Sequence, residues 1–235
     1  MIEELNKRYG SREIKNRTRY HKETYVEGQV DYFLEISLPE LREFVRIHQK
    51  QITDKEIIEL LTHKIHDYRT LALMILESRA KKGNLTRQKE VFDLYLKYLD
   101  HVNNWDLVDL SAPSILGRYV YNQKDYSLLY ELVKTENLWH KRIGIVASLY
   151  LIKQNEVKTT LELVDILIVE THDLLQKACG WMLREVGKIN QNALDCYLKE
   201  NYQIMPRTML RYAIEKYPEE IRSQILKGEF LWQQK

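Results

Sequence analysis

The feature that most constrains the fold of this chain is a pattern that recurs about every 36 residues. Each copy has two marked positions that lie three residues apart. The first position is basic in four of the five copies, and the second is small or apolar in four of the five. Successive copies are separated by 37, 35, 36 and 30 residues, and they are Arg69/Ala72, Asp106/Asp109, Lys141/Gly144, Lys177/Gly180 and Arg207/Leu210. A period of this length indicates repeated helical units that stack on one another.

Each repeat is predicted to be a pair of helices. The apolar segment of a repeat is followed by a polar break and then by a second amphipathic segment, near residues 87–99, 157–169 and 193–202. A helix pair of this size cannot bury its apolar face alone, so it must pack against its neighbours. The sequence therefore predicts an all-α fold, a HEAT-like α-solenoid of about six stacked antiparallel helix pairs, forming a single domain over residues 1–235.

Two local signals agree with helices. Ser37 and Glu40 have the spacing of a capping box, with Pro39 in the first turn. Pro218, followed by Glu219 and Glu220, is expected to begin the last helix in the same way.

Composition limits the class of protein. The chain is 44% hydrophobic and 30% charged, which is typical of a folded domain, and its 8 Gly and 4 Pro are too few for the many turns of an all-β fold. The longest apolar run, residues 143–152, is half of what a bilayer span needs. The first residues lack signal-peptide order, and Cys179 and Cys196 do not form a disulfide framework. We therefore expect a cytoplasmic protein with reduced cysteines, not associated with a membrane, and a monomer.

The distribution of charge is more informative than its sum. A net charge of +2 and a pI near 8.3 are only weak indications of a nucleic-acid partner. Between residues 7 and 22, however, seven basic residues stand against the single acid Glu13. A second basic group consists of Arg79, Lys81, Lys82, Arg87 and Lys89. Solvated helix faces or loops are the commoner explanation for such groups, and phosphate binding is the alternative.

The second repeat departs from the pattern, because both of its marked positions, Asp106 and Asp109, are acidic. Trp105 and Asp109 lie four residues apart and therefore share a helix face. Pro113 has no N–H to offer the carbonyl of Asp109, so the helix is expected to bend there. A Trp on a helix usually packs in the core and an Asp usually faces solvent, so this spacing alone favours a structural role. The same holds for Trp139, Trp181 and Trp232, and Trp232 is expected to cover the last helix.

Residues 103–109, Asn-Asn-Trp-Asp-Leu-Val-Asp, resemble the Trp-x-x-x-Asp motif of the AlkD-type DNA alkylation repair glycosylases. Residues 177–185, Lys-Ala-Cys-Gly-Trp-Met-Leu-Arg-Glu, are similar to a longer and more specific block of the same family. Residues 37–42, 66–73 and 138–142 also match in order and spacing. The resemblance covers roughly residues 33–217.

The resemblance implies a concave basic wall that holds double-stranded DNA, and excision of cationic alkylpurines such as 3-methyladenine and 7-methylguanine. It assigns the catalytic site to Asp109, Trp105, Trp181 and Arg142. A carboxylate would stabilise the oxocarbenium-like charge that develops on the sugar, indole faces attract cations, and a guanidinium binds phosphate. Further cations expected on the DNA-binding wall are Lys141, Lys177, Arg184, Arg207 and Arg211.

One part of the family pattern is missing. In the active members a basic amphipathic helix precedes the first capping box, whereas residues 22–32 of this chain contain Gly28 and two valines and are predicted to be a loop. Two alternatives therefore stay open. The protein could be a non-catalytic binder of branched or distorted DNA, or a protein-interaction scaffold of HEAT-like repeats, because a fold does not fix a function.

No metal or other cofactor is expected from the sequence. His63 and His66 lie three residues apart, but no Cys or carboxylate at ligand spacing completes a zinc site with them. The glycine-rich motifs that bind nucleotides are also missing from the sequence.

Overall fold

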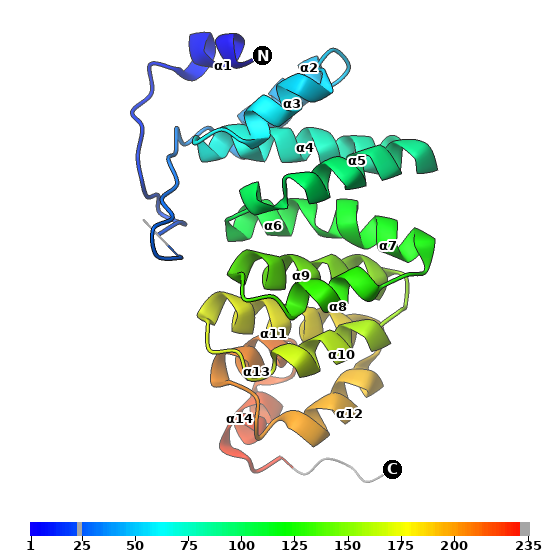
Figure 1. Cartoon of the computed structure of the whole chain (residues 1–235). Helices are drawn as coiled ribbons and strands as arrows, with labels where there is room; N and C mark the ends of the chain where they lie inside the picture. The colour runs from blue at the N-terminus through cyan, green and yellow to red at the C-terminus, as the bar shows by residue number, and fades with distance from the viewer. Residues whose placement is uncertain (23–24, 231–235) are drawn as a thin grey trace. The chain divides into compact units, whose positions relative to one another are not determined.

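The computed structural model describes residues 1–22 and 25–230, and it is all-helical apart from loops and two isolated β-bridges (Figure 1). The first positions of the five repeats all fall on helices, and each of these helices is followed by a second one. The predicted all-α class of consecutive helix pairs is therefore confirmed. The contacts divide the chain into two compact units, Met1–Ser111 and Ala112–Lys235, and the expectation of one domain stays a prediction.

The first unit is built around one long helix. Its α4 (His66–Lys82) is buried on almost every side from His66 to Leu76, and it contacts α2, α3, α5 and α6. A helix that is apolar all round is stable only when neighbours cover it, and these four helices do so. The other helical elements of the unit are α1 (Ile2–Tyr9), α2 (Leu38–His48), α3 (Asp54–Leu61), α5 (Leu85–Lys97), the 3-10 turn η1 (Leu99–His101) and α6 (Trp105–Ser111).

The capping signals are confirmed. The Ser37 hydroxyl accepts the N–H of Glu40 at 3.4 Å, and the Glu40 carboxylate accepts the N–H of Ser37 at 2.9 Å. The same reciprocal arrangement, at Thr53 and Glu56, begins α3. At the other end of the chain Pro218 caps α14 (Glu219–Lys227), as predicted.

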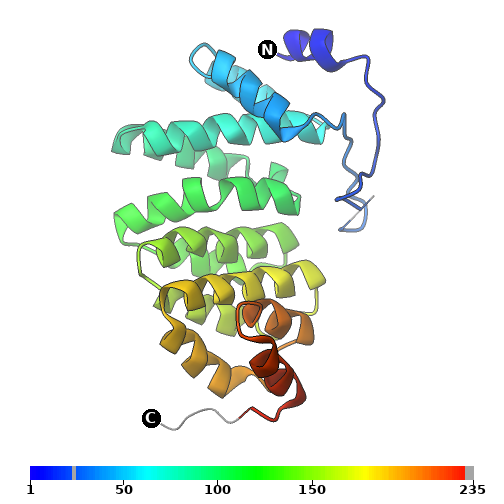
Figure 2. The same cartoon turned by 180° about the vertical axis from the view of Figure 1, so that it is seen from behind.

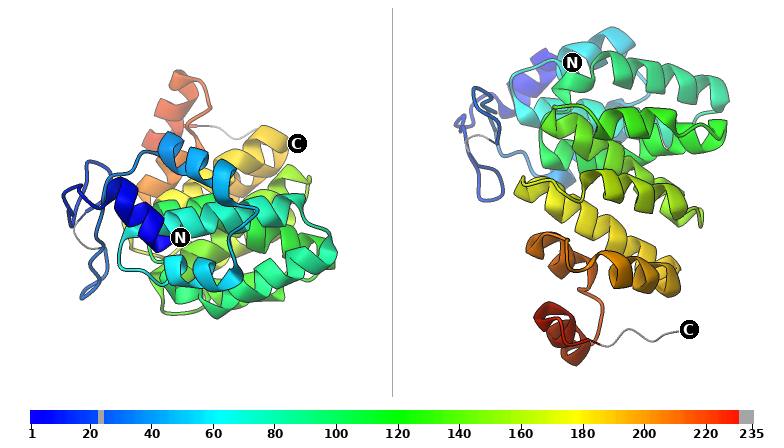
Figure 3. Two further views of the ribbon diagram at one scale, coloured as in Figure 1. Left: turned by 90° about the horizontal axis from the view of Figure 1, so that it is seen from above. Right: turned by 60° about the horizontal axis from the view of Figure 1, so that its bottom comes forward.

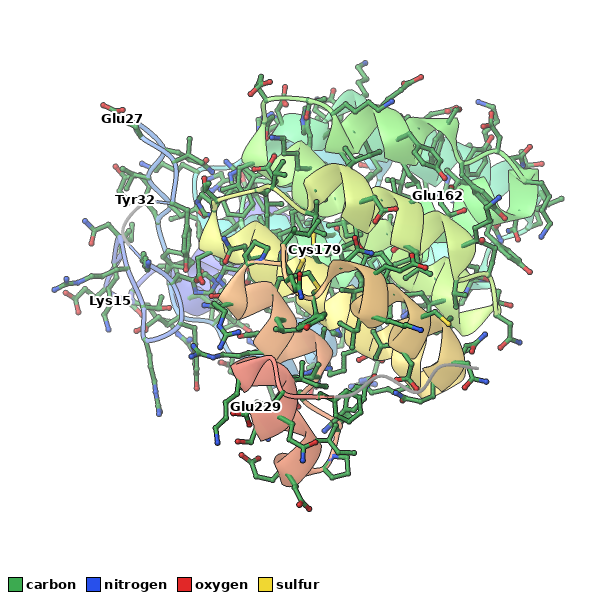
Figure 4. The ribbon with its side chains drawn as sticks, turned by 90° about the horizontal axis from the view of Figure 1, so that it is seen from below. Lys15, Glu27, Tyr32, Glu162, Cys179 and Glu229 are labelled. Carbon is green, nitrogen blue, oxygen red and sulfur yellow. The ribbon has the colours of Figure 1, made fainter. Side chains whose placement is uncertain are left out.

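The segment between α1 and α2 contains no helix among its described residues, so the loop predicted for residues 22–32 is confirmed there (Figure 3). Gly28 occupies the left-handed backbone region with φ of 77°, which suits a turn and not a helix. In Figure 4 the side chains of Lys15 and Glu27 project outward from this loop.

Backbone hydrogen bonds hold this loop together and attach it to α4. Lys15 and Phe33 exchange two of them, at 2.9 and 2.7 Å, and the N–H of His66 donates to the carbonyl of Tyr32 at 2.7 Å. The buried Asp67 adds to this, because its two carboxylate oxygens accept the N–H groups of Leu34 at 2.8 Å and Ile36 at 2.7 Å. The first turn of α4 therefore positions the whole end of the loop.

The second unit is a stack in which α9 (Leu138–Lys153), α11 (Asp173–Ile189) and α13 (Arg207–Ala213) contact one another in order (Figure 2). Each is followed by a shorter partner helix, α10 (Lys158–Leu167), α12 (Gln191–Asn201) and α14 respectively. The unit begins with the π-helical turn η2 (Pro113–Gly117), α7 (Arg118–Gln123) and α8 (Ser127–Val133).

Two sequence features of this unit have clear structural consequences. Pro113 interrupts the α-helical hydrogen bonds as predicted, and the N–H of Gly117 instead reaches the carbonyl of Ala112, five residues back, at 2.9 Å. Gly180 lets α11 approach α13 closely, because a Cβ at this position would lie 2.4 Å from the carbonyl oxygen of Met209.

The remaining predictions concern the two cysteines, a membrane span and Trp232. Cys179, labelled in Figure 4, is buried on α11 and Cys196 is exposed, and neither forms a disulfide. Among the described helices none is long and apolar enough to cross a membrane. Trp232 lies outside the described residues.

Candidate functional site

The two predicted site residues of the first unit lie one turn apart on α6. Trp105 is its first residue and Asp109 follows on the same face, and both side chains are half-buried. The side-chain oxygen of Asn104, the residue before this helix, accepts the N–H of Trp105 at 2.8 Å. The expected pairing of an indole and a carboxylate on one helix is therefore present, while the chemical role of both residues stays a prediction.

One face of Trp105 is covered by a residue that sequence reasoning did not select. The imidazole of His21, from the N-terminal loop, stacks on the indole with ring centroids 5.2 Å apart and an interplanar angle of 17°. His21 also contacts the ring of Phe33 at 4.9 Å and the ring of His66 at 5.1 Å. The loop therefore places an aromatic cluster at the N-terminal ends of α4 and α6.

Asp106 lies between the two imidazoles of this cluster. Its Oδ1 accepts a hydrogen bond from Nε2 of His66 at 2.9 Å and another from the N–H of Leu107 at 2.9 Å, and it lies 3.3 Å from Nε2 of His21. Burial by itself raises the pKa of a carboxyl group, but the two imidazoles outweigh it and hold the pKa of Asp106 well below its usual range. Asp106 is therefore an ionised carboxylate at neutral pH.

A buried ion pair supports the cluster from behind. Asp31, from the loop, pairs with Arg69 of α4, and both side chains are less than a tenth exposed. The second oxygen of Asp31 accepts the side-chain amide of Asn104 at 2.8 Å, while Arg69 donates to the carbonyl of His63 at 3.0 Å. These bonds attach the loop to α4 and to Asn104, the residue just before α6.

A cavity of about 460 Å³ opens beside the cluster. Its polar wall includes His21, His66 and Asp106, and Trp105 closes one side. Its apolar wall comes from side chains of α2, α4, α6 and the loop, among them Leu41, Met74 and Leu110. Asp109 is not part of this wall among the described residues. The cavity is large enough for a small planar molecule or a solvated ion.

The remaining predicted site residues, Arg142 and Trp181, belong to the second unit. Arg142 is only 5% exposed, and its Nη1 donates to the carbonyl of Leu174 at 2.6 Å. Trp181 is half-buried, and its indole N–H donates to Glu185 at 3.1 Å. Arg142 thus has a packing role between α9 and α11 within this unit, whereas its assigned phosphate contact stays a prediction.

Most cations expected on the DNA-binding wall have acidic partners within the protein. Lys141 pairs with Glu170 at 2.5 Å, Lys177 pairs with Asp173 at 2.6 Å, and Arg184 pairs with Glu215. The remaining two, Arg207 and Arg211, have exposed side chains, and Arg207 donates to the carbonyl of Leu226. Lys177 and Asp173 form an exposed and therefore weak pair, whereas Lys141 and Arg184 are half-buried, and a phosphate that binds any of the three has to displace its acid.

The two basic groups noted in the sequence differ in how many of their cations pair with acids. In the second group four of the five cations pair with nearby acids, namely Arg79 with Asp54, Lys81 with Glu77, Arg87 with Glu90 and Lys89 with Asp93. That group is a balanced, solvated surface. In the N-terminal group Arg12 pairs with Glu40 and Lys15 with Glu35, while the side chains of Lys7, Arg17 and Lys22 are exposed.

Comparison with known proteins gives the family. The sequence profile of the family described as "DNA alkylation repair enzyme" matches residues 1–217. The chain belongs to this family. The match agrees with the resemblance carried by residues 103–109 and 177–185. No match was found among the curated proteins.

Two solved structures resemble this DNA alkylation repair family member in fold. A predicted DNA alkylation repair enzyme from Enterococcus faecalis is 16% identical, with a TM-score of 0.63, over 80% of this chain and 90% of that one. The protein smu.31 from Streptococcus mutans UA159 is also 16% identical, with a TM-score of 0.53, over 82% and 90% of the two chains. At this identity the likeness supports the helical fold only.

Sequence reasoning missed the grouping of His21, His66 and Asp106. His63 and His66 drew attention because they are neighbours, but the partners of His66 are 45 residues before it and 40 after it in the sequence. Only the acidic exception at Asp106 in the basic repeat position marked this place. The fold of the N-terminal loop supplies the third member, and no local pattern predicts that fold.

Proposed function

We propose that this DNA alkylation repair family member binds double-stranded DNA and hydrolyses the N-glycosidic bond of cationic alkylpurines such as 3-methyladenine and 7-methylguanine. The observation that carries the proposal is Trp105 and Asp109 on one face of α6, in a chain of this family. Double-stranded DNA is accordingly the proposed partner. We further propose that the protein is cytoplasmic and monomeric.

The chemistry requires little of the protein. An alkylated purine already carries a positive charge and leaves as a neutral base, so no acid is needed to protonate it. Cleavage builds positive charge on the sugar, which a carboxylate at Asp109 would stabilise while it orients a water molecule. The open face of Trp105 would lie against the cationic base or sugar, and Trp181 would offer a second indole.

The test is release of 7-methylguanine from methylated duplex DNA by the purified full-length protein. Asp109→Asn keeps the size of the side chain and removes its charge, so we expect release to fall by about a hundredfold or more. Asp93→Asn, on the exposed face of α5, is the matched control and should retain wild-type release. Absence of release by the wild type at high enzyme concentration would reject the enzymatic part.

The second candidate is a non-catalytic binder of branched or distorted DNA. It is favoured by two observations, that the described residues between α1 and α2 form no helix and that His21 covers one face of Trp105. The comparison of a four-way junction with a linear duplex of equal length distinguishes the two functions. Tighter binding to the junction, without release of a base from either substrate, would support this candidate and contradict the first.

A further inference from the structure

We propose that His21, His66 and Asp106 form a binding site for one divalent transition-metal ion, of the Zn²⁺ type. The three residues come from the loop, from the start of α4 and from the start of α6. One ligand atom of each, two imidazole nitrogens and a carboxylate oxygen, lies within 4.8 Å of the other two. Imidazole and carboxylate are common ligands of zinc in proteins.

A threonine hydroxyl lies beside Nδ1 of each imidazole, and that of Thr70 is placed to accept a hydrogen bond from the ring of His66. Nδ1 of His21 lies 3.0 Å from the hydroxyl of Thr18, and Nδ1 of His66 lies 3.4 Å from that of Thr70. The hydroxyl of Thr70 also donates to the backbone carbonyl of His66 at 3.1 Å, which leaves its oxygen free to accept from the ring. Metal-binding histidines are usually fixed in this way by an outer hydrogen bond on the other ring nitrogen. Here both Nε2 atoms are left facing Asp106.

The carboxylate between them is held equally firmly. The N–H of Leu107 donates to Oδ1 of Asp106 at 2.9 Å, so this oxygen cannot turn away without losing a backbone hydrogen bond. Asp106 supplies one negative charge to the site and, with two neutral imidazoles, would partly neutralise a divalent ion. The positive charge that remains would attract an anionic oxygen to the fourth position of the ion.

One nitrogen of the cluster lacks the partner that its burial requires. Nε2 of His21 is shielded from solvent and makes no hydrogen bond of acceptable geometry within the described residues, although Oδ1 of Asp106 is 3.3 Å away. A buried polar atom of this kind usually makes a well-formed hydrogen bond, and here it has only the longer contact with Asp106. A metal ion bound by its lone pair would supply that partner.

The distances suit a tetrahedral ion after small movements of the side chains. With bonds of about 2.0–2.1 Å, the ligand atoms of tetrahedral zinc lie about 3.3 Å apart. The carboxylate oxygen is 2.9 Å from Nε2 of His66 and 3.3 Å from Nε2 of His21. The ion therefore fits if the carboxylate moves slightly away from His66 and the two Nε2 atoms, which lie within 4.8 Å of each other, settle about 3.3 Å apart. With three protein ligands, the fourth position opens toward the neighbouring cavity, where a water molecule or an anionic oxygen can bind.

The competing explanation is a plain hydrogen-bond network. In that case Nε2 of His66 keeps its proton and donates to Asp106, and the cluster serves only to attach the loop. Metal binding instead requires the lone pair of Nε2 on both rings. The two explanations are distinguished by direct measurement of metal binding, which is independent of any activity toward DNA and therefore of the proposed function.

The test is titration of the chelator-treated full-length protein with Zn²⁺ by calorimetry and with Co²⁺ by visible absorption. We expect one ion per chain and the intense visible bands of four-coordinate Co²⁺. Asp106→Asn and His66→Gln should weaken binding by at least about a hundredfold, and Thr70→Val, which removes only the outer hydroxyl, by about tenfold. Saturating Zn²⁺ should also raise the midpoint of thermal unfolding in the wild type and not in the ligand variants.

Two controls address other ligands on the chain. Cys196→Ser removes the exposed thiol and His140→Gln removes a histidine of the second unit, and both should bind like the wild type. If His66→Gln does not fold, His21→Gln on the loop provides the same comparison. Failure of the wild type to bind either ion, or equal binding by the ligand variants, would overturn the proposal.

Discussion

At the scale of single residues, the buried pair of Asp31 and Arg69 determines whether the N-terminal loop stays on the helices. Removal of one member of a buried ion pair leaves the other charge without compensation in a poorly solvated place. Nε of Arg69 lacks a hydrogen-bond partner among the described residues, and Asp31 compensates the charge of the guanidinium, whose other bonds go to the carbonyls of His63 and Lys64. The pair therefore contributes more to the stability of the fold than the exposed ion pairs of the same unit.

Asp31→Ala is expected to lower the free energy of unfolding by about 3 kcal/mol or more, because it leaves Arg69 buried and unpaired and also removes the bond to Asn104. Urea unfolding followed by circular dichroism measures the change. Glu27→Ala, at an exposed site on the same loop, is the control and should change stability by less than about 0.5 kcal/mol. A loss in Asp31→Ala no larger than in this control would show that the pair does not stabilise the loop.

At the scale of helices, the close approach of α11 to α13 depends on one glycine. A Cβ on Gly180 would meet the backbone oxygen of Met209 at 2.4 Å, and backbone cannot move aside as a side chain can. Gly180→Ala should therefore separate the two helices and lower the free energy of unfolding by about 1–3 kcal/mol. The decrease in the midpoint of thermal unfolding is the measurement.

Gly187 provides the matched control, because it lies on the same α11 and takes the same substitution. Its added Cβ would meet the end of the flexible Leu194 side chain at 2.5 Å, and alanine is the better helix former by about 1 kcal/mol. Gly187→Ala should accordingly be close to neutral. Equal destabilisation by both substitutions would mean that the helix spacing does not depend on Gly180.

The capping box at the start of α2 gives a prediction about pH. Hydrogen bonds from the side chain and backbone of Ser37 lower the pKa of Glu40 below its ordinary value. A carboxyl with a lowered folded-state pKa adds stability that is complete above its unfolded pKa and is lost as the pH falls through the folded value. The stability difference between the wild type and Glu40→Gln should therefore be larger near pH 6 than near pH 3, as measured by thermal unfolding. A difference that does not change with pH would contradict this.

The elements were largely predictable from the sequence, whereas the aromatic cluster was not. The repeat, the capping box at Ser37, the helix start at Pro218 and the interruption at Pro113 depend on residues close together in the chain, so local patterns reveal them. The His21 contacts depend instead on how a loop without a periodic pattern returns to α4 and α6. The burial of Arg142 was also unexpected, because the phosphate contact that the resemblance assigns to it suggests a surface cation and not one bonded to the carbonyl of Leu174.

At the scale of the whole molecule, a net charge of +2 is too small to attract DNA by itself, so attraction depends on which cations are not paired with acids. Three of the cations expected on the DNA-binding wall are paired with acids, and the exposed Arg211 is a cation that can bind phosphate at little cost. Under the proposed function, few counterions would be released on binding. The dependence of DNA affinity on salt should therefore be shallow for a protein of this size.

Arg211→Ala is expected to weaken binding to a short duplex and to reduce the slope of log affinity against log salt concentration by about 1, because one phosphate contact is lost. Fluorescence anisotropy over a series of salt concentrations gives both quantities. Arg46→Ala, an exposed arginine of α2 that pairs with Glu43, is the matched control and should leave the slope unchanged. If the wild type does not bind duplex DNA even at low salt, no phosphate contact exists to be lost, and a HEAT-repeat scaffold for proteins becomes the better account of this chain.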